Sequence, residues 1–157
     1  MGQTIYVPIA GMGIGKSGDK LYTVVGSCVA IMLYDKHLSI GGMIHIMLGY
    51  SRNRKDNPTK YADTGIPYLI RMMCMQGASP HRLKSAKISG AGEMFEVLNQ
   101  DTSVSRSNIK DVKELLEQHD IQIIASDLGG TSGRRVSFDT STGRVQIVAQ
   151  GRRDMIL

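Results

Sequence analysis

The sequence predicts a single-domain layered fold of the α/β or α+β class. About seven segments have the β-branched or continuously apolar composition of strands, and two or three have helical spacing. Strand-type segments lead in the N-terminal third, which argues against a simple alternation of strand and helix. The chain has 157 residues, shows no repeat and no linker, and is long enough to bury one continuous core. We therefore expect residues 1–157 to form one domain.

The strand assignments rest on composition and on turn residues. Residues 21–34 are apolar on both alternating faces and are interrupted by Gly26 and Ser27, which is typical of a strand buried on both sides, and a helix that starts near Cys28 is the alternative. Four glycines in residues 11–18 predict a flexible, tightly turning stretch. The segment 121–126 is expected to be a buried strand, and the last two strands are expected to form a hairpin. The expected strands are residues 3–10, 21–34, 39–48, 84–89, 121–126, 134–138 and 144–149.

Helices are predicted where apolar residues recur at helical spacing, in residues 61–76 and 107–119. Gly77 suits the position just after the first of these helices. A shorter helix is expected from residue 93 toward residue 99. The polar, charged segment 51–60 between strand and helix is expected to be a surface loop.

Composition excludes several classes of protein. Apolar residues at 41% and charged residues at 21% are typical of an ordinary globular chain. No apolar run approaches the roughly 20 residues that cross a bilayer, and the N-terminus lacks a secretory signal. Two cysteines then indicate the reducing cytoplasm, with Cys28 and Cys74 as free thiols. The net charge of +5 is scattered along a chain that has no Trp, which argues against a nucleic-acid partner.

Cys28 and His45 are the first candidates for catalysis. A thiolate is a strong nucleophile, and an imidazole beside it both generates the thiolate and carries its proton. The pair predicts acyl-transfer chemistry, with backbone N–H groups near Gly26 and Ser27 available to stabilise an oxyanion. The alternative reading makes Cys28 a small buried residue, His45 a hydrogen-bonded strand histidine and Ser27 a small residue that the turn requires.

A second motif points elsewhere. Residues 10–17 (AGMGIGKS) follow an apolar strand and loosely resemble a phosphate-binding P-loop. Such a loop needs a helix directly after Lys16 and Ser17, because the phosphate sits on the N-terminus of that helix. The β-branched, glycine-interrupted residues that follow do not favour a helix, so nucleotide hydrolysis is a minor alternative. The histidines and cysteines show no metal-ligand spacing, and we expect no metal and no other cofactor.

Six blocks of the sequence, in order, resemble the chemoreceptor glutamine deamidase family, CheD. The glycine–serine–cysteine block and the histidine block are specific when they occur together. The blocks are residues 21–30 (LYTVVGSCVA), 45–48 (HIML), 60–64 (KYADT), 87–95 (KISGAGEMF), 127–130 (DLGG) and 133–138 (GRRVSF).

This resemblance implies an enzyme that converts chemoreceptor glutamines to glutamates, a cysteine-dependent protein-glutamine amidohydrolase. By matching motif positions it implies Cys28 as nucleophile, His45 as base and Thr23 as the third member of a triad. It also implies a layered α-β-β sandwich with mixed sheets, similar to bacterial toxins that deamidate glutamine. The expected partners are the cytoplasmic helices of chemoreceptors and a CheC-type phosphatase, with no insertion into the membrane.

The sequence departs from the family pattern at two places. Gly49 stands where a proline is usual, and in residues 103–108 only Asn108 matches a glycine–arginine–asparagine stretch. Other functions stay open at this point: a receptor methylesterase that uses the same thioester, or a non-catalytic module that regulates the phosphatase. Arg134 and Arg152 are expected to be solvated charges, and Cys74 is expected to pack in its helix.

Overall fold

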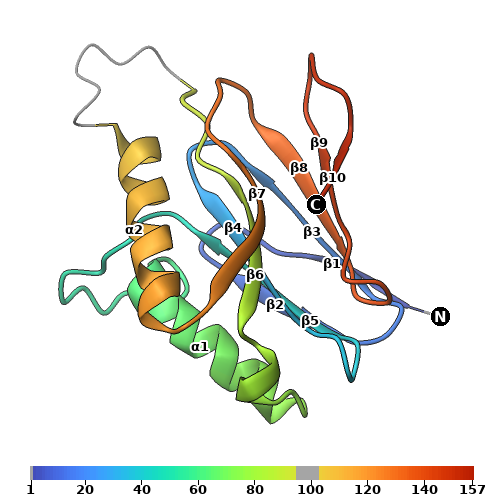
Figure 1. Ribbon diagram of the computed structural model, residues 1–157. Coiled ribbons are helices and arrows are strands. Elements are labelled where there is room, and N and C mark those ends of the chain that lie inside the picture. The colour runs from blue at the N-terminus through green and yellow to red at the C-terminus, as the bar shows by residue number, and fades with distance from the viewer. Residues whose placement is uncertain (1, 95–102) are drawn as a thin grey trace.

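A computed structural model describes residues 2–94 and 103–157 of the chain (Figure 1). The helices are α1 (Ala62–Met75) and α2 (Val104–Gln118), with a short 3₁₀ turn at Pro80–Arg82. The strands are β1 (Thr4–Tyr6), β2 (Met12–Gly15), β3 (Lys20–Val25), β4 (Val29–Asp35), β5 (Ile40–Ile46), β6 (Ser85–Gly90), β7 (Gln122–Leu128), β8 (Arg134–Asp139), β9 (Val145–Val148) and β10 (Met155–Ile156). No helix in these ranges is long and apolar enough to cross a membrane.

The strands form two five-stranded sheets. Sheet A has the order β1-β3-β8-β9-β10, and sheet B has the order β2-β5-β4-β6-β7. Each sheet contains one parallel pair, β1 with β3 in sheet A and β6 with β7 in sheet B, while the other neighbours are antiparallel. Both sheets are therefore mixed, as the resemblance implied.

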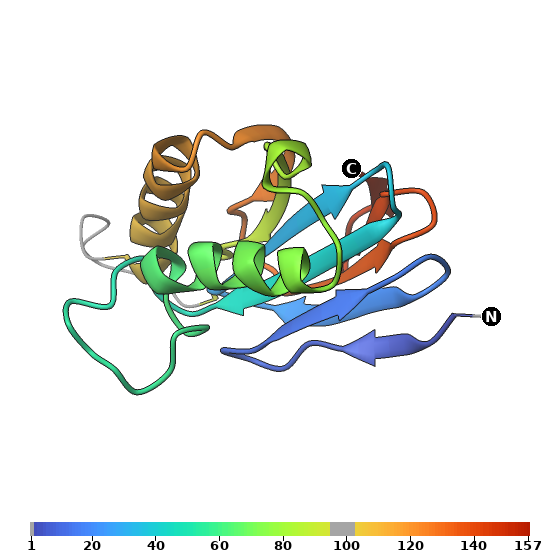
Figure 2. The same cartoon turned by 90° about the horizontal axis from the view of Figure 1, so that it is seen from below.

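The layers follow from two separate apolar clusters. One cluster joins both helices to the outer face of sheet B, through Ile66 of α1, Leu116 of α2 and Ile31 of β4. The other lies between the sheets and joins Phe138 of sheet A to Met32 of sheet B. Figures 1 and 2 show both helices on the same side of the strands. The order helices, sheet B, sheet A confirms the α-β-β sandwich.

Strands β4 and β5 of sheet B are buried on both faces, and the alternation of side chains along them decides which residues face which layer. In β4, Ile31 packs toward the helices while Ala30 and Met32 pack toward sheet A. In β5, Ile44 packs toward the helices and Met43 packs toward sheet A. This explains why β4 and β5 have an almost continuous apolar sequence, because a strand between two layers has no polar face.

The prediction of one strand over residues 21–34 is wrong. The chain leaves sheet A after Val25 and enters sheet B at Val29, so β3 and β4 are separate strands in different sheets. The outer face of β3 is open to solvent, since Val24 is 57% exposed. Gly26 and Ser27 therefore mark a crossing between layers and not an irregularity within one strand.

The glycine stretch is also different from the prediction. Residues 12–15 form strand β2, whose Gly13 and Gly15 pair with Met43 and Gly41 of β5. A side chain at Gly15 would collide with Asp19, because a Cβ there would lie 2.9 Å from the Asp19 Cβ. The next element is strand β3, so no helix follows Lys16 and the P-loop alternative is wrong.

The remaining assignments are largely confirmed. The helix at 61–76, the strands at 39–48 and 84–89, and the C-terminal hairpin lie where expected. Helix α2 begins three residues early, and strand β10 was not predicted. Strand β7 is an edge strand and not a buried one, because its side chains alternate in exposure and Ile124 is 55% exposed. The short helix expected over 93–99 falls mostly on residues outside those described.

Candidate active site

Cys28 lies at the crossing between the sheets, immediately before β4. Its side chain is half-buried and packs against the apolar cluster between the sheets. It therefore continues the alternation of β4 and points to the same layer as Ala30. The two backbone carbonyls on either side of Ser27 are held by main-chain donors: Gly92 N–H bonds the Gly26 carbonyl and Ala91 N–H bonds the Cys28 carbonyl, each at 2.8 Å. These two hydrogen bonds fix the backbone of the turn that carries the thiol.

His45 belongs to β5 and points to the same layer. It pairs directly with Ala30, and opposite residues of an antiparallel pair lie on one face. Cys28 is two residues before Ala30 and one residue beyond the last pair of this ladder, Val29 with Ile46, so it lies near His45 at the end of the pairing. The register thus brings the two predicted residues near each other, although no hydrogen bond joins the Cys28 sulfur to the imidazole within the described residues. Catalytic hydrogen bonds of free enzymes commonly shorten only when substrate binds.

Thr23 comes from the other sheet and meets His45 across the interface. The Thr23 Oγ1 lies 2.7 Å from His45 Nδ1 and 2.8 Å from the Val7 carbonyl oxygen. A carbonyl only accepts, so the single hydroxyl proton of Thr23 goes to Val7 and the hydroxyl accepts from Nδ1–H. The imidazole therefore carries its proton on Nδ1. Nε2 is therefore unprotonated and basic, and a general base needs this tautomer of the ring.

Burial sets the charge state of the pair. The thiol is half-buried, and loss of hydration raises the pKa of Cys28 above its ordinary value. The imidazole is 1% exposed, and burial lowers the pKa of His45 to about 4. Both groups are therefore neutral at pH 7. The resting site holds a thiol and a free imidazole base, so the proton has to move when substrate arrives.

The N–H groups of Ser27 and Cys28 donate no hydrogen bond to a backbone carbonyl among residues 2–94 and 103–157. Gly26 lies against the side chain of Met94, since a Cβ at Gly26 would lie 3.2 Å from the Met94 Cγ. A small residue at position 26 therefore allows a neighbouring side chain, and by the same reasoning a substrate, to approach the turn. The arrangement suits an oxyanion site beside the thiol.

Comparison with known proteins gives the same family as the sequence blocks. A family model described as "CheD chemotactic sensory transduction" matches residues 47–149. A "Probable chemoreceptor glutamine deamidase CheD" from Clostridium botulinum strain Hall is 43% identical over 152 residues, covering 94% of this chain and 93% of the relative. A protein with the same description from Methanococcus maripaludis strain C5 is 39% identical over 142 residues, covering 90% of this chain and 92% of the relative.

The chain belongs to the CheD family. The matched range of the family model begins after His45, so that match does not include Thr23, Cys28 or His45. Catalytic roles for those three side chains in this CheD-family chain are therefore proposed from the geometry and the sequence motifs, and not from that match.

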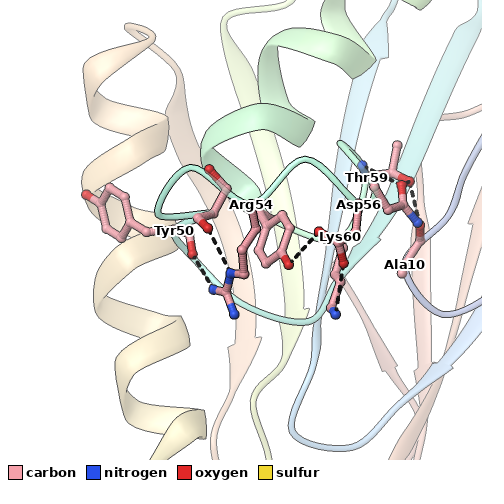
Figure 3. A network of polar contacts seen from close by, with 9 residues as sticks. Ala10, Tyr50, Arg54, Asp56, Thr59 and Lys60 are labelled. Atoms are coloured by element: carbon pink, nitrogen blue, oxygen red, sulfur yellow. Dashed lines mark hydrogen bonds and ion pairs between the residues drawn. The ribbon is translucent and has the colours of Figure 1, made fainter.

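The backbone of His45 is held by Ala10 and Gly11, at the start of the glycine stretch. His45 N–H donates to the Gly11 carbonyl at 2.9 Å, and the His45 carbonyl accepts from Ala10 N–H at 3.0 Å. The Ala10 carbonyl in turn accepts from Asn57 Nδ2 at 3.0 Å and from the Thr59 hydroxyl (Figure 3). The loop before α1 therefore supports the strand that carries the imidazole.

The same loop is organised by its own side chains. The cations of Arg54 and Lys60 lie over the ring of Tyr61, and the Tyr61 hydroxyl donates to Asp56 at 2.9 Å. The Arg54 guanidinium lies 4.7 Å from the ring centroid of Tyr61 and its Nε donates to the Ser51 carbonyl. The predicted surface loop 51–60 is thus an ordered support and not only a connection.

Arg134 is a buried charge, contrary to the prediction, whereas Arg152 is exposed as predicted and pairs with a buried carboxylate. Arg134 is 3% exposed, and its Nη1 lies 3.1 Å from a carboxylate oxygen of Asp127. Arg152 bonds the same carboxylate at 2.9 Å, and these two cations hold the pKa of Asp127 below its usual value. Arg134 Nη2 also bonds the Gly129 and Ser132 carbonyls. This ion network fixes the loop after β7. In the sequence, this loop was recognised only as one block of the family resemblance.

The departure at Gly49 has a local cause. A Cβ at position 49 would lie 2.2 Å from the Cβ of Asp111 on α2, so proline does not fit here. Cys74 is half-buried and packs against the helix–sheet core, as predicted. No group of three or more His, Cys, Asp or Glu side chains that could hold a metal occurs within the described part of the chain.

Proposed function

We propose that this CheD-family chain is a chemoreceptor glutamine deamidase with Cys28, His45 and Thr23 as its catalytic triad. The observation that carries the proposal is the Thr23–His45 contact across the two sheets, because it leaves His45 Nε2 basic on the face that Cys28 shares. Support comes also from the curated relatives, which are named as probable enzymes of this kind. Both sheets contribute to the triad, so we propose that residues 1–157 act as one domain.

The chemistry begins with transfer of the thiol proton from Cys28 to His45 Nε2. The sulfur attacks the carboxamide carbon of the substrate glutamine, and the N–H groups at Ser27 and Cys28 stabilise the oxyanion. The imidazolium then protonates the departing nitrogen, which leaves as ammonia, and a thioester remains on Cys28. His45 takes a proton from water, the resulting hydroxide attacks the thioester, and the proton returns to sulfur as glutamate is released. Thr23 holds the ring throughout and stabilises the imidazolium less than a carboxylate would.

The substrate of this proposal is a glutamine on the cytoplasmic helices of a chemoreceptor, and the proposed site of action is the cytoplasm. Free Cys28 and Cys74 are consistent with a reducing compartment. A CheC-type phosphatase is proposed as the binding partner. This partner follows from the family resemblance and not from a feature of the fold.

The test is incubation with a receptor cytoplasmic fragment followed by peptide mass mapping. Deamidation adds about one dalton at each modified glutamine, because the acyl carbon exchanges nitrogen for oxygen. Cys28→Ala is expected to abolish this change and the release of ammonia while keeping the wild-type circular dichroism spectrum. Ammonia release by a folded Cys28→Ala protein would remove the proposal.

The same experiment separates the two alternatives from the sequence. A receptor methylesterase would remove about fourteen daltons from methylated glutamates instead. A non-catalytic module would leave every receptor peptide unchanged and would still affect the phosphatase when Cys28 is replaced. Either result would contradict the proposed deamidase.

A further inference from the structure

Helix α2 contacts the active-site turn through one buried amide. Asn108 is 1% exposed, and its Nδ2 donates to the Ser27 carbonyl at 3.1 Å and to the Met47 carbonyl at 3.0 Å. An amide nitrogen carries two hydrogens, so these two contacts use all of its donor capacity. The reverse orientation would set the amide oxygen against two carbonyl oxygens, which assigns the orientation of the side chain.

The two acceptors belong to the two segments that carry the reacting groups. Ser27 directly precedes Cys28, and Met47 lies two residues after His45. Asn108 therefore joins the nucleophile segment and the base segment through a single rigid group.

This link stands where the sheet itself no longer joins the two segments. The pairing of β4 with β5 ends at Val29 and Ile46. Beyond that pair the Met47 N–H donates to the Lys60 carbonyl at 2.8 Å, so the chain after β5 turns toward the loop before α1. The backbone ladder is absent at the position of Cys28, and the amide of Asn108 replaces it.

Among the described residues, the Ser27 carbonyl is the one carbonyl of the turn that is bonded by a side chain. Its neighbours at Gly26 and Cys28 are held by the main-chain N–H groups of Gly92 and Ala91. A substitution cannot remove those main-chain donors, whereas a substitution at Asn108 releases the middle of the turn.

We propose that Asn108 is a positioning residue that sets the geometry between the Cys28 sulfur and the His45 imidazole. The inference rests on the proposed function for the identity of the reacting groups. Its physical basis is the steep dependence of rate on placement, since an error of about 1 Å costs about 100-fold. Release of the Ser27 carbonyl also lets water reach the half-buried thiol of Cys28.

The experiment compares Asn108→Ala and Asn108→Ser with Ser103→Ala in a Cys74→Ser background. Ser103 caps the same helix by accepting from Arg106 N–H and donates to the Glu93 carboxylate, and among the described residues it makes no hydrogen bond to Ser27 or Met47. It therefore controls for loss of α2 stability. The readouts are kcat and KM for deamidation of the receptor fragment, the rate of Cys28 alkylation by iodoacetamide from pH 6 to pH 10, and urea unfolding.

If Asn108 has this role, its replacement should change the rates of deamidation and of alkylation at the Cys28 sulfur in opposite directions. In Asn108→Ala, kcat falls about 10- to 100-fold with KM within about twofold, while alkylation becomes faster and its pH midpoint moves down. Asn108→Ser keeps one donor and gives intermediate values. Ser103→Ala loses stability and leaves both reactions as in the parent protein.

Parallel behaviour of the Asn108 and Ser103 variants in both reactions would overturn the proposal, because it would reduce Asn108 to a structural contact. Unchanged kcat in a folded Asn108→Ser protein would also overturn it. Alkylation of Cys28 needs no receptor, so its result stands even if the protein has no deamidase activity. The two readouts therefore distinguish failure of the proposed deamidase function from failure of the proposed role of Asn108.

Discussion

The Thr23 hydroxyl and the His45 imidazole meet at 2.7 Å although they belong to different sheets. Because the same hydroxyl donates to the Val7 carbonyl at 2.8 Å, it accepts from Nδ1–H and fixes one tautomer of the ring. The basic nitrogen then lies on the side of the ring away from Thr23. The relation depends on packing sheet A on sheet B, so the integrity of the sandwich and the state of the base are coupled.

Thr23→Val tests this relation, because valine keeps the shape of the side chain and removes the oxygen. We expect kcat to fall about 10- to 100-fold with little change in KM, since the imidazole loses both its orientation and its tautomer. Thr23→Ser keeps the hydroxyl and should retain most activity. His45→Gln, which removes the base, should lose about 1,000-fold or more.

The measurement is steady-state ammonia release, together with ¹⁵N chemical shifts of the His45 ring. In the wild type these shifts should report a protonated Nδ1 and a bare Nε2. Wild-type kcat in Thr23→Val, or a ring protonated on Nε2, contradicts the assignment.

The stability of the protein should depend on pH through His45. The pKa of His45 is lowered from 6.5 to about 4 in the folded state, so between these values only the unfolded state binds the proton. Stability is therefore complete above pH 6.5 and falls as the pH decreases toward 4. Over this interval the free energy of unfolding decreases by about 3 kcal/mol, because His45 is buried and stays neutral in the folded state.

Urea unfolding at several pH values from 4 to 8 measures this dependence. His45→Gln should show a shallower slope between pH 6.5 and 4, since glutamine does not titrate. Equal slopes for the variant and the wild type would mean that His45 is not the group responsible.

Lys16→Ala should have no effect on deamidation or on stability. Lys16 is exposed, and the contacts of this residue are made by its backbone: its N–H bonds Asp19 and its carbonyl accepts from Thr140. An exposed side chain without contacts changes stability by less than about 0.5 kcal/mol. Isothermal titration with ATP should detect no binding to either protein, and heat of binding that Lys16→Ala removes would restore the P-loop hypothesis.

Asp127→Asn should be strongly destabilising because it leaves the buried cation of Arg134 without its counter-charge. Loss of one partner of a buried ion pair costs about 3–5 kcal/mol. The matched control is Lys110→Gln, which removes the exposed Lys110–Glu114 pair and should change stability by less than about 1 kcal/mol. Urea unfolding compares the two variants, and a loss for Asp127→Asn as small as for the control would show that the network is not stabilising.

Several parts of the fold could be predicted because their signals are local. The helical spacing in residues 61–76, with Gly77 at positive φ after it, depends only on neighbouring residues. The hairpin of β8 and β9 is similarly local. The glycine–serine–cysteine turn and the histidine block were recognisable as a motif, and the register of β4 with β5 pairs His45 with Ala30, two residues after Cys28.

The assignments that failed depended on contacts between distant parts of the chain. Whether residues 21–34 form one strand or two is decided by the presence of a second sheet, which no short window contains. Arg134 looks like any charged residue until Asp127 packs against it, and β7 is exposed because it lies at the edge of its sheet. Burial is a property of the assembled layers, so a charge or an apolar run alone does not determine it.

By itself the sequence determined the two long helices, most of the strands, the family and the chemical types of the proposed reacting groups. Only the tertiary structure decided that the thiol stands where the chain changes sheets, that Thr23 selects the tautomer of His45, and that Asn108 joins the two segments. The physical reason is that side-chain chemistry and short-range periodicity depend only on residues that are consecutive in the sequence. Distances, protonation states and hydrogen-bond partners arise when layers built from separate segments pack against one another.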